Sequence, residues 1–411
     1  MKAFEYYNPA KIIFGAGSIN KIKALLENVK AKSLLLVYSG DFIKDLGIYQ
    51  EVREATKELG IDFYENGSVV PNPSIELVRS LVAEGKENNV DFVLAVGGGS
   101  SIDTAKAVAI GIPYDGDVWD FFSKGVTPEK VLPIGVISTT ASSGSETSNA
   151  AILSSGEWKL GFEDDRIIPQ FAIMDPAYTA GLPKYQTAVG IADVLAHLLE
   201  RYFSDERNSD ATDYLIEGAV RALILNGKRL IHLLEKADPS VYISYNRPDS
   251  SDEEKALYEE YINARAEVQW LASVAHNNFL DAGRSADWGS HRIEHELSAQ
   301  YNITHGEGMA VVFVAWTKYI ADVKPWRPAL LANRVFGIDS YDYSEKERAL
   351  ILSGKLKDFF KELGVATSLT ELGIDSKDFQ VMADRATRNG AVGHYEKLDS
   401  EKIKKILEIA L

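Results

Sequence analysis

The amino-acid sequence predicts an α/β domain over residues 1–182, followed by an all-α domain over residues 183–411. In the first part, short runs of apolar and β-branched residues alternate with helical patterns, and this order indicates a doubly wound parallel sheet covered by helices. After Pro183 the strand signal almost disappears, while helical spacing continues. A length of 411 residues accommodates two such domains, since domains average about 150 residues.

Four apolar runs of the first domain predict buried strands. They are continuous rather than alternating, as expected for a parallel sheet with helices on both faces. The runs are Ser33–Tyr38, Asp91–Val96, Leu132–Ser138 and Phe171–Met174. Residues 74–89 predict a helix between the first two runs, because their apolar side chains recur at helical spacing and Ser74 is a suitable N-cap.

Helical periodicity defines the second domain. Glycine, proline, serine and aspartate separate its segments, most clearly over Asp238–Ser251. The predicted helices are Lys184–Phe203, Thr212–Lys236, Asp252–Leu280, Arg292–Ala299 and Gly308–Val323.

Composition excludes several classes of protein. The chain has no cysteine, which rules out disulfides, thiolate nucleophiles and iron–sulfur clusters, so any metal must be bound by nitrogen and oxygen. Sixty acidic residues against 44 basic ones argue against nucleic-acid binding, which needs a clustered basic surface. The longest apolar stretch, Met309–Trp316, is far shorter than the roughly 20 residues of a membrane helix. The N-terminus lacks the apolar segment of a signal peptide, and we therefore expect a cytoplasmic protein.

Three consecutive glycines, Gly97–Gly99, directly follow a predicted strand and lead into a helical pattern. Glycine permits unusual backbone angles and lets a phosphate approach without meeting a side chain. The exposed amides at the start of the helix then bind the anion. The loop matches neither G-x-G-x-x-G nor a Walker motif, and a tight structural turn is the alternative interpretation.

A polar cluster, Thr139–Glu146, follows the strand predicted over Leu132–Ser138. Its hydroxyl groups are suited to ribose and phosphate oxygens, and ligands of open α/β sheets bind at the carboxyl ends of strands. Serine and threonine also favour capped loops, which is the alternative. Together with the glycine loop, the cluster favours a nucleotide cofactor.

The seven histidines are unevenly distributed, and three of them fall between residues 291 and 305. Asp193 and His197 are four residues apart, which places them on one face of a helix. One carboxylate and several imidazoles suit Zn²⁺ or Fe²⁺. The sequence therefore predicts a metal site, whereas His232, His276 and His394 are interpreted as ordinary surface or core residues.

A competing interpretation concerns His291–His295, which fits the H-x-x-E-H pattern of inverted zinc metalloproteases. Both histidines would then be ligands, and Glu294 would be the base for a zinc-bound water. This alternative leaves the glycine loop unexplained.

The chain resembles the iron-containing (group III) alcohol dehydrogenases, and within them the butanol-dehydrogenase-like branch. The resemblance runs nearly from end to end, with several separated motifs in the same order and spacing. These motifs are Asn8–Gly17, Gly97–Ala109, Thr139–Glu146, Met174–Pro183, Gly190–Glu200 and His291–Gly306.

The resemblance implies an N-terminal Rossmann-like domain, a C-terminal helical domain with a cleft between them, and a homodimer. It implies that the metal ligands are Asp193, His197, His291 and His305. His295 matches an additional family histidine that is usually not a ligand, and it is our candidate for a proton relay. The metal is expected to be Fe²⁺, with Zn²⁺ as the alternative.

For the cofactor, the resemblance implies that a glycine-rich loop binds the pyrophosphate and that other polar residues contact the rest of the nucleotide. The pyrophosphate residues are Gly97, Gly98, Gly99 and Ser100; Asp103 lies near the cofactor; Thr139, Thr140 and Ser142 contact the nucleotide. Lys159, in a segment interpreted as the loop Ser154–Phe162, matches a lysine that reaches a ribose.

The turn after the strand Ser33–Tyr38 bears on the choice between NAD and NADP. NAD-preferring relatives place an acidic residue where this chain has Gly40, and this favours NADP. Asp41, one residue later, could bind a ribose 2′-hydroxyl or repel a 2′-phosphate, which keeps NAD as the alternative.

The implied activity is reversible hydride transfer between NAD(P)(H) and a primary alcohol or aldehyde of the butanol type. One alternative is a glycerol- or dehydroquinate-type enzyme that uses NAD and zinc on the same architecture. A more remote one is a nucleotide-binding protein without turnover, for which an intact set of metal ligands would be unexpected.

Overall fold

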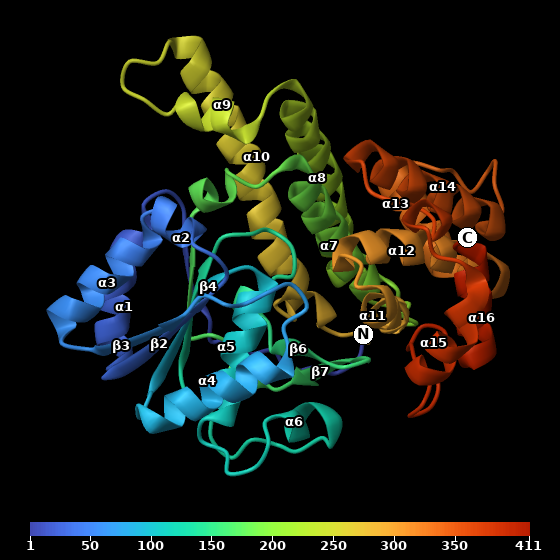
Figure 1. The fold of residues 1–411 in the computed structure, drawn as a ribbon. Coiled ribbons are helices and arrows are strands. Elements are labelled where there is room, and N and C mark those ends of the chain that lie inside the picture. The colour runs from blue at the N-terminus through green and yellow to red at the C-terminus, as the bar shows by residue number, and fades with distance from the viewer. The chain divides into compact units, whose positions relative to one another are not determined.

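The computed structural model describes all 411 residues, and the chain divides into two compact units (Figure 1). The sheet unit consists of Tyr7–Gly181 and Tyr245–Ser273. The helical unit consists of Met1–Tyr6, Leu182–Ser244 and Val274–Leu411. The sequence predicted a single boundary between residues 182 and 183. The structure differs in two segments: Met1–Tyr6 belongs to the helical unit, and Tyr245–Ser273 belongs to the sheet unit.

Specific contacts tie these two segments to their units. The hydroxyl of Tyr261 donates a hydrogen bond of 2.6 Å to the carbonyl oxygen of Ala180, and the hydroxyls of Thr147 and Ser273 lie 2.8 Å apart. At the N-terminus, the amide of Lys2 donates to the carbonyl oxygen of Gly283 over 2.9 Å. Sequence patterning carries no information on such long-range contacts.

The sheet unit is built on six parallel strands in the order β1-β8-β5-β4-β2-β3. Their bounds are β1 Lys11–Phe14, β2 Ser33–Tyr38, β3 Asp62–Asn66, β4 Phe92–Gly97, β5 Ile134–Ser138 and β8 Phe171–Met174. The four predicted strands are confirmed within two residues at each end. The edge strands β1 and β3 were not predicted, because they are polar or exposed along much of their length.

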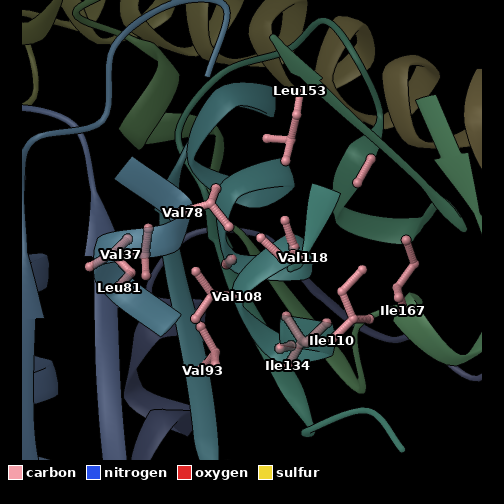
Figure 2. Close-up of a cluster of buried hydrophobic side chains, with 14 of the residues drawn as sticks. Val37, Val78, Leu81, Val93, Val108, Ile110, Val118, Ile134, Leu153 and Ile167 are labelled. Atoms are coloured by element: carbon pink, nitrogen blue, oxygen red, sulfur yellow. The ribbon is translucent and has the colours of Figure 1, made fainter. Parts of the chain in front are cut away.

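Helices cover both faces of the sheet, which confirms the doubly wound α/β prediction. One cluster of buried side chains joins β2, β4 and β5 to α4 and α5, and includes Val37, Val78, Val93 and Val108 (Figure 2). A second cluster packs the other face of the sheet against α1 and α3. The helices are α1 Ile22–Val29, α2 Phe42–Asp45, α3 Ile48–Leu59, α4 Ile75–Glu87, α5 Gly99–Gly111 and α6 Trp119–Ser123. Ser74 caps α4 as predicted, accepting a hydrogen bond from the Leu77 amide.

An antiparallel hairpin, β6 Ala150–Ser155 and β7 Trp158–Glu163, occupies the segment that we interpreted as the loop Ser154–Phe162. That interpretation was wrong. The two strands meet at Gly156, whose φ of 56° suits a tight turn, and β7 buries Lys159, Leu160 and Phe162 while its other residues are exposed.

The helical unit contains no strand, as predicted for residues 183–411. Its helices are α7 Lys184–Tyr202, α8 Asp210–Lys236, α9 Pro239–Ser244, α11 Gly289–Tyr301, α12 His305–Val323, α13 Trp326–Phe336, α14 Glu345–Leu363, α15 Phe379–Ala386 and α16 Ser400–Ile409. The last residues of α10, Asp252–His276, also belong to it. Helix α7 is buried on all sides from Thr187 to Tyr202. None of the helices has both the length and the apolar character needed to cross a membrane.

Candidate functional site

Helix α7 buries two polar side chains, Asp193 and His197. They lie one turn apart, and their side chains are 6% and 4% exposed. Nδ1 of His197 lies 3.7 Å from Oδ1 of Asp193, and this buried nitrogen has no hydrogen-bond partner. A buried polar atom without a partner is costly, so the pair is suited to a group that it would bind.

Helices α11 and α12 bring His291 and His305 to the same place. The ring centroids of His197 and His291 are 4.9 Å apart, and those of His291 and His305 are 5.3 Å apart. Nε2 of His305 lies 3.6 Å from Oδ1 of Asp193. Potential ligand atoms of Asp193, His197 and His291 all lie within 4.8 Å of one another. The structure thus brings all four predicted ligand residues together.

The chain reverses sharply between these two histidines. Asn302 ends α11 in the left-handed conformation, with φ of 52°, and α12 begins at His305. Gly306 then lets α12 pass close to α7, since a Cβ at this position would overlap the carbonyl oxygen of Val189. The glycine after His305 is therefore required for His305 to reach Asp193.

Two buried glutamates are hydrogen-bonded to the Nδ1 atoms of His291 and His305. Oε1 of Glu200 lies 2.8 Å from Nδ1 of His291 and accepts the His291 amide over 2.9 Å. Oε2 of Glu294 is hydrogen-bonded to Nδ1 of His305, and its Oε1 accepts from the hydroxyl of Ser298. Both glutamates are fully buried. Because Glu294 holds His305, its carboxylate is not placed as the base that the metalloprotease pattern requires.

Two further histidines lie in the cluster. His295, the predicted relay, has its ring 5.8 Å from that of His305. His276, which we interpreted as an ordinary residue, stacks on His197 with a centroid distance of 4.3 Å and an angle of 24°. The sequence offered no signal for this contact, because no helical spacing relates residue 276 to residue 197.

Burial sets the charge state of the cluster. Desolvation, followed by the neighbouring His276 and His291, lowers the pKa of His197 well below its ordinary value. Burial raises the pKa of Glu200 to about 7, although the hydrogen bonds from the amides of His291 and Trp288 lower it in part. A neutral imidazole is the form that binds metals. One carboxylate and three imidazoles, with an unpartnered nitrogen among them, therefore fit a divalent ion such as Fe²⁺ or Zn²⁺.

In the sheet unit, β4 ends at Gly97 and α5 begins at Gly99. Gly97 has φ of 145°. A Cβ on Gly98 would stand 2.5 Å from Oγ1 of Thr140, and one on Gly99 would stand 2.7 Å from Oγ of Ser143. The two predicted loops thus lie side by side at the carboxyl edge of the sheet. A side-chain-free backbone at the start of a 13-residue helix fits a phosphate group.

The other predicted cofactor residues surround this loop. Ser100, Thr140 and Ser142 are half-buried, while Thr139 is buried and donates its amide to the carbonyl oxygen of Gly97 over 3.0 Å. Gly40 lies in the turn after β2 with φ of 69°. Asp41 is exposed, and its Oδ1 accepts from Nζ of Lys44 over 2.6 Å.

Asp103 and Lys159 lie deeper, beside a lysine that sequence reasoning missed. Asp103 accepts from the hydroxyl of Ser145 over 2.6 Å and from the amide of Ile152 over 3.0 Å, so it ties α5 to β6. Burial raises the pKa of Asp103, and the charges of Lys106 and Lys159 oppose this. Lys106 is fully buried, and burial lowers its pKa to about 8.

Comparison with known proteins identifies the family. Residues 9–176 match the iron-containing alcohol dehydrogenase family, and residues 253–411 match its C-terminal domain. The chain is 37% identical to NADH-dependent butanol dehydrogenase A of Clostridium acetobutylicum over 99% of each chain. It is 30% identical to an NADPH-dependent aldehyde reductase of Escherichia coli, over 95% of this chain and 94% of that one. The crystal structure of NADH-dependent butanol dehydrogenase A from Thermotoga maritima superimposes with a TM-score of 0.89 at 33% identity, over 100% of this chain and 99% of that one. The chain belongs to the iron-containing alcohol dehydrogenase family.

Proposed function

We propose that the chain is a metal-dependent alcohol dehydrogenase and aldehyde reductase. It transfers a hydride reversibly between NAD(P)(H) and a primary alcohol or aldehyde of the butanol type. The observation that carries this proposal is the convergence of Asp193, His197, His291 and His305 in the helical unit. The substrate class is supported by relatives that are named as butanol dehydrogenases and as an aldehyde reductase.

The four residues would hold the metal, with Fe²⁺ favoured by the family and Zn²⁺ compatible with the same ligands. A bound divalent ion supplies Lewis acidity, which stabilises negative charge on the substrate oxygen. The carboxylate of Asp193 balances part of the charge of the ion, and the lowered pKa of His197 keeps that ring neutral. His295, half-buried beside His305, is the proposed proton relay.

The glycine loop would bind the pyrophosphate of the cofactor through backbone amides at the start of α5. We favour NADP(H) over NAD(H), because Gly40 has no carboxylate to bind a ribose 2′-hydroxyl and the carboxylate of Asp41 is paired with Lys44. The names of the relatives divide between NADH and NADPH. Rates with the two reduced cofactors, measured with butanal, decide the choice.

Replacement of one ligand tests the metal assignment. We expect His305→Ala to lose both bound metal and turnover, measured by elemental analysis and by oxidation of NADPH or NADH with butanal. His232→Ala is the matched control, since His232 is exposed on α8 and outside the cluster. Full activity in a metal-free His305→Ala variant would contradict the proposal.

The homodimer and the cytoplasmic location that we expected from the sequence stay predictions. Sedimentation velocity of the purified protein checks the homodimer.

A further inference from the structure

The helices of the metal cluster share a sequence pattern. His197 and Glu200 on α7 are separated by two residues, as are His291 and Glu294 on α11. In each pair, the glutamate contacts a histidine on the next of the three helices α7, α11 and α12, taken in chain order. Glu200 of α7 holds His291 of α11, and Glu294 of α11 holds His305 of α12.

We propose that Glu200 and Glu294 are positioning residues that fix the tautomer and ring orientation of His291 and His305. The inference rests on the proposed function, since it takes these two histidines as metal ligands. A carboxylate accepts hydrogen bonds, so the hydrogen of each ring lies on Nδ1 and the lone pair lies on Nε2. In His305 this is the nitrogen 3.6 Å from Oδ1 of Asp193.

Each glutamate is itself held by more than one donor. Oε2 of Glu200 accepts the amide of Trp288 over 2.7 Å, in addition to the two bonds from His291. Oε1 of Glu294 accepts from Ser298. A buried carboxylate is costly unless such bonds satisfy it, and a fully satisfied one is rigid. The two carboxylates therefore have little freedom to turn away from the rings.

The packing around Glu294 leaves little space for another residue. A Cβ on Gly308 would stand 2.9 Å from both Cγ and Oε1 of Glu294. Two glycines of α12 therefore permit close contacts. Gly306 packs against α7, and Gly308 packs against the side chain of Glu294. The first glycine lets His305 approach Asp193, and the second leaves room for the carboxylate that orients His305.

Glu294 also belongs to a second group of potential metal ligands. Potential ligand atoms of Glu294, His295 and His305 lie within 4.8 Å of one another, which would suit a second ion. Nδ1 of His305 and the carboxylate of Glu294 are already hydrogen-bonded to each other. We therefore expect the histidine cluster to bind one metal ion.

The test compares two glutamates of the same helix. Glu294→Gln removes the charge that faces His305, and Glu296→Gln is the matched control. Glu296 is also buried on α11, but its Oε2 accepts from Nε of Arg385 over 2.9 Å. We expect Glu294→Gln and Glu200→Gln to weaken the binding of Co²⁺ and Zn²⁺ roughly 10- to 100-fold, the usual cost of losing an outer-sphere partner. The affinity of Glu296→Gln should equal that of the wild type.

The measurements are metal dissociation constants by chelator competition, the stoichiometry, and the visible absorption spectrum of the Co²⁺ form. The spectrum should change in Glu294→Gln and remain unchanged in Glu296→Gln, which a merely structural role would not produce. Ser298→Ala, which removes the donor to Oε1 of Glu294, serves if Glu294→Gln fails to fold, and it should weaken binding in the same direction.

Unchanged affinity and spectra in the Glu294 and Glu200 variants, or two ions bound at the histidine cluster of the wild type, would overturn the inference. Failure of the proposed function has a different signature. In that case the wild-type protein would bind no metal at the cluster, or His305→Ala would retain full turnover.

Discussion

Gly306 lies against the main-chain carbonyl oxygen of Val189, and a Cβ at residue 306 would overlap that oxygen. The same Cβ would stand 3.3 Å from the Cβ of Asp193. Helix α12 thus approaches α7 at the point where each carries a proposed metal ligand. The close approach of two backbones, rather than long side chains, brings His305 and Asp193 together.

We expect Gly306→Ala to destabilise the protein and weaken metal binding. The obstacle is a backbone atom in a buried helix, so it cannot turn aside, and overpacking of this kind costs about 1–3 kcal/mol. Urea unfolding and metal analysis measure the two effects. Gly218→Ala is the control, because Gly218 is exposed on α8 with open space around it and should gain about 0.5–1 kcal/mol. Equal stability of the two variants would contradict the argument.

The glycine loop allows a second test. We expect Gly99→Ala to raise the KM for the nicotinamide cofactor, because its methyl group would crowd the start of α5 and the neighbouring loop Thr139–Glu146. That methyl would stand 2.7 Å from Oγ of Ser143. The double variant Gly99→Ala/Ser143→Ala removes the shorter contact, while the Cβ of residue 143 stays 3.1 Å away, and it keeps the methyl group at the start of α5. If the double variant recovered normal cofactor binding, the loop would have only a structural role.

A third prediction concerns Gly40. Gly40→Asp should lower kcat/KM for NADPH by at least about fivefold, because like charges about 4 Å apart repel by ~1 kcal/mol even in water. Gly40 has φ of 69°, which strains any side chain, so Gly40→Asn is the control that carries the strain without the charge. A wild-type preference for NADH, or an equal loss in both variants, would contradict the assignment to NADP(H).

The parts of the fold that could be predicted are those whose signal is local. Strands β2 and β8 were predicted with correct bounds because every residue of each is buried and all but Ser33 and Tyr38 are aliphatic or otherwise apolar. Helical spacing placed Asp193 and His197 on one face of a helix, and the family resemblance supplied their assignment as metal ligands. Strand β3 was missed because its sequence, DFYEN, is half-exposed and polar.

The residues that sequence reasoning missed depend on contacts between distant segments. His276 stacks on His197 from the end of another helix, and nothing in its neighbourhood distinguishes it from an exposed histidine such as His232. Lys106 resembles an ordinary helix lysine, although it is buried and donates to the carbonyl oxygens of Ser148 and Ala150, each over 2.8 Å. Glu200 and Glu294 form a visible pattern, but their role depends on which helix lies opposite.

The last prediction uses the buried carboxyl group of Glu146. Burial raises its pKa from 4.5 to about 7, and the charge of Lys106 opposes this only in part. Between pH 4.5 and 7 the folded protein retains a proton that the unfolded chain has lost, so the stability due to this group falls as the pH rises through that interval. Glu146→Gln removes the penalty. Without cofactor it should be more stable than the wild type at pH 8, by about 3.5 kcal/mol at most, since one pKa unit corresponds to about 1.4 kcal/mol. The difference should shrink towards pH 4.5, and urea unfolding at several pH values measures it.

Glu129→Gln, at an exposed site of the same unit, controls for the loss of one negative charge. A Glu146→Gln variant that is less stable than the wild type at pH 8 would show that the carboxylate stabilises the loop.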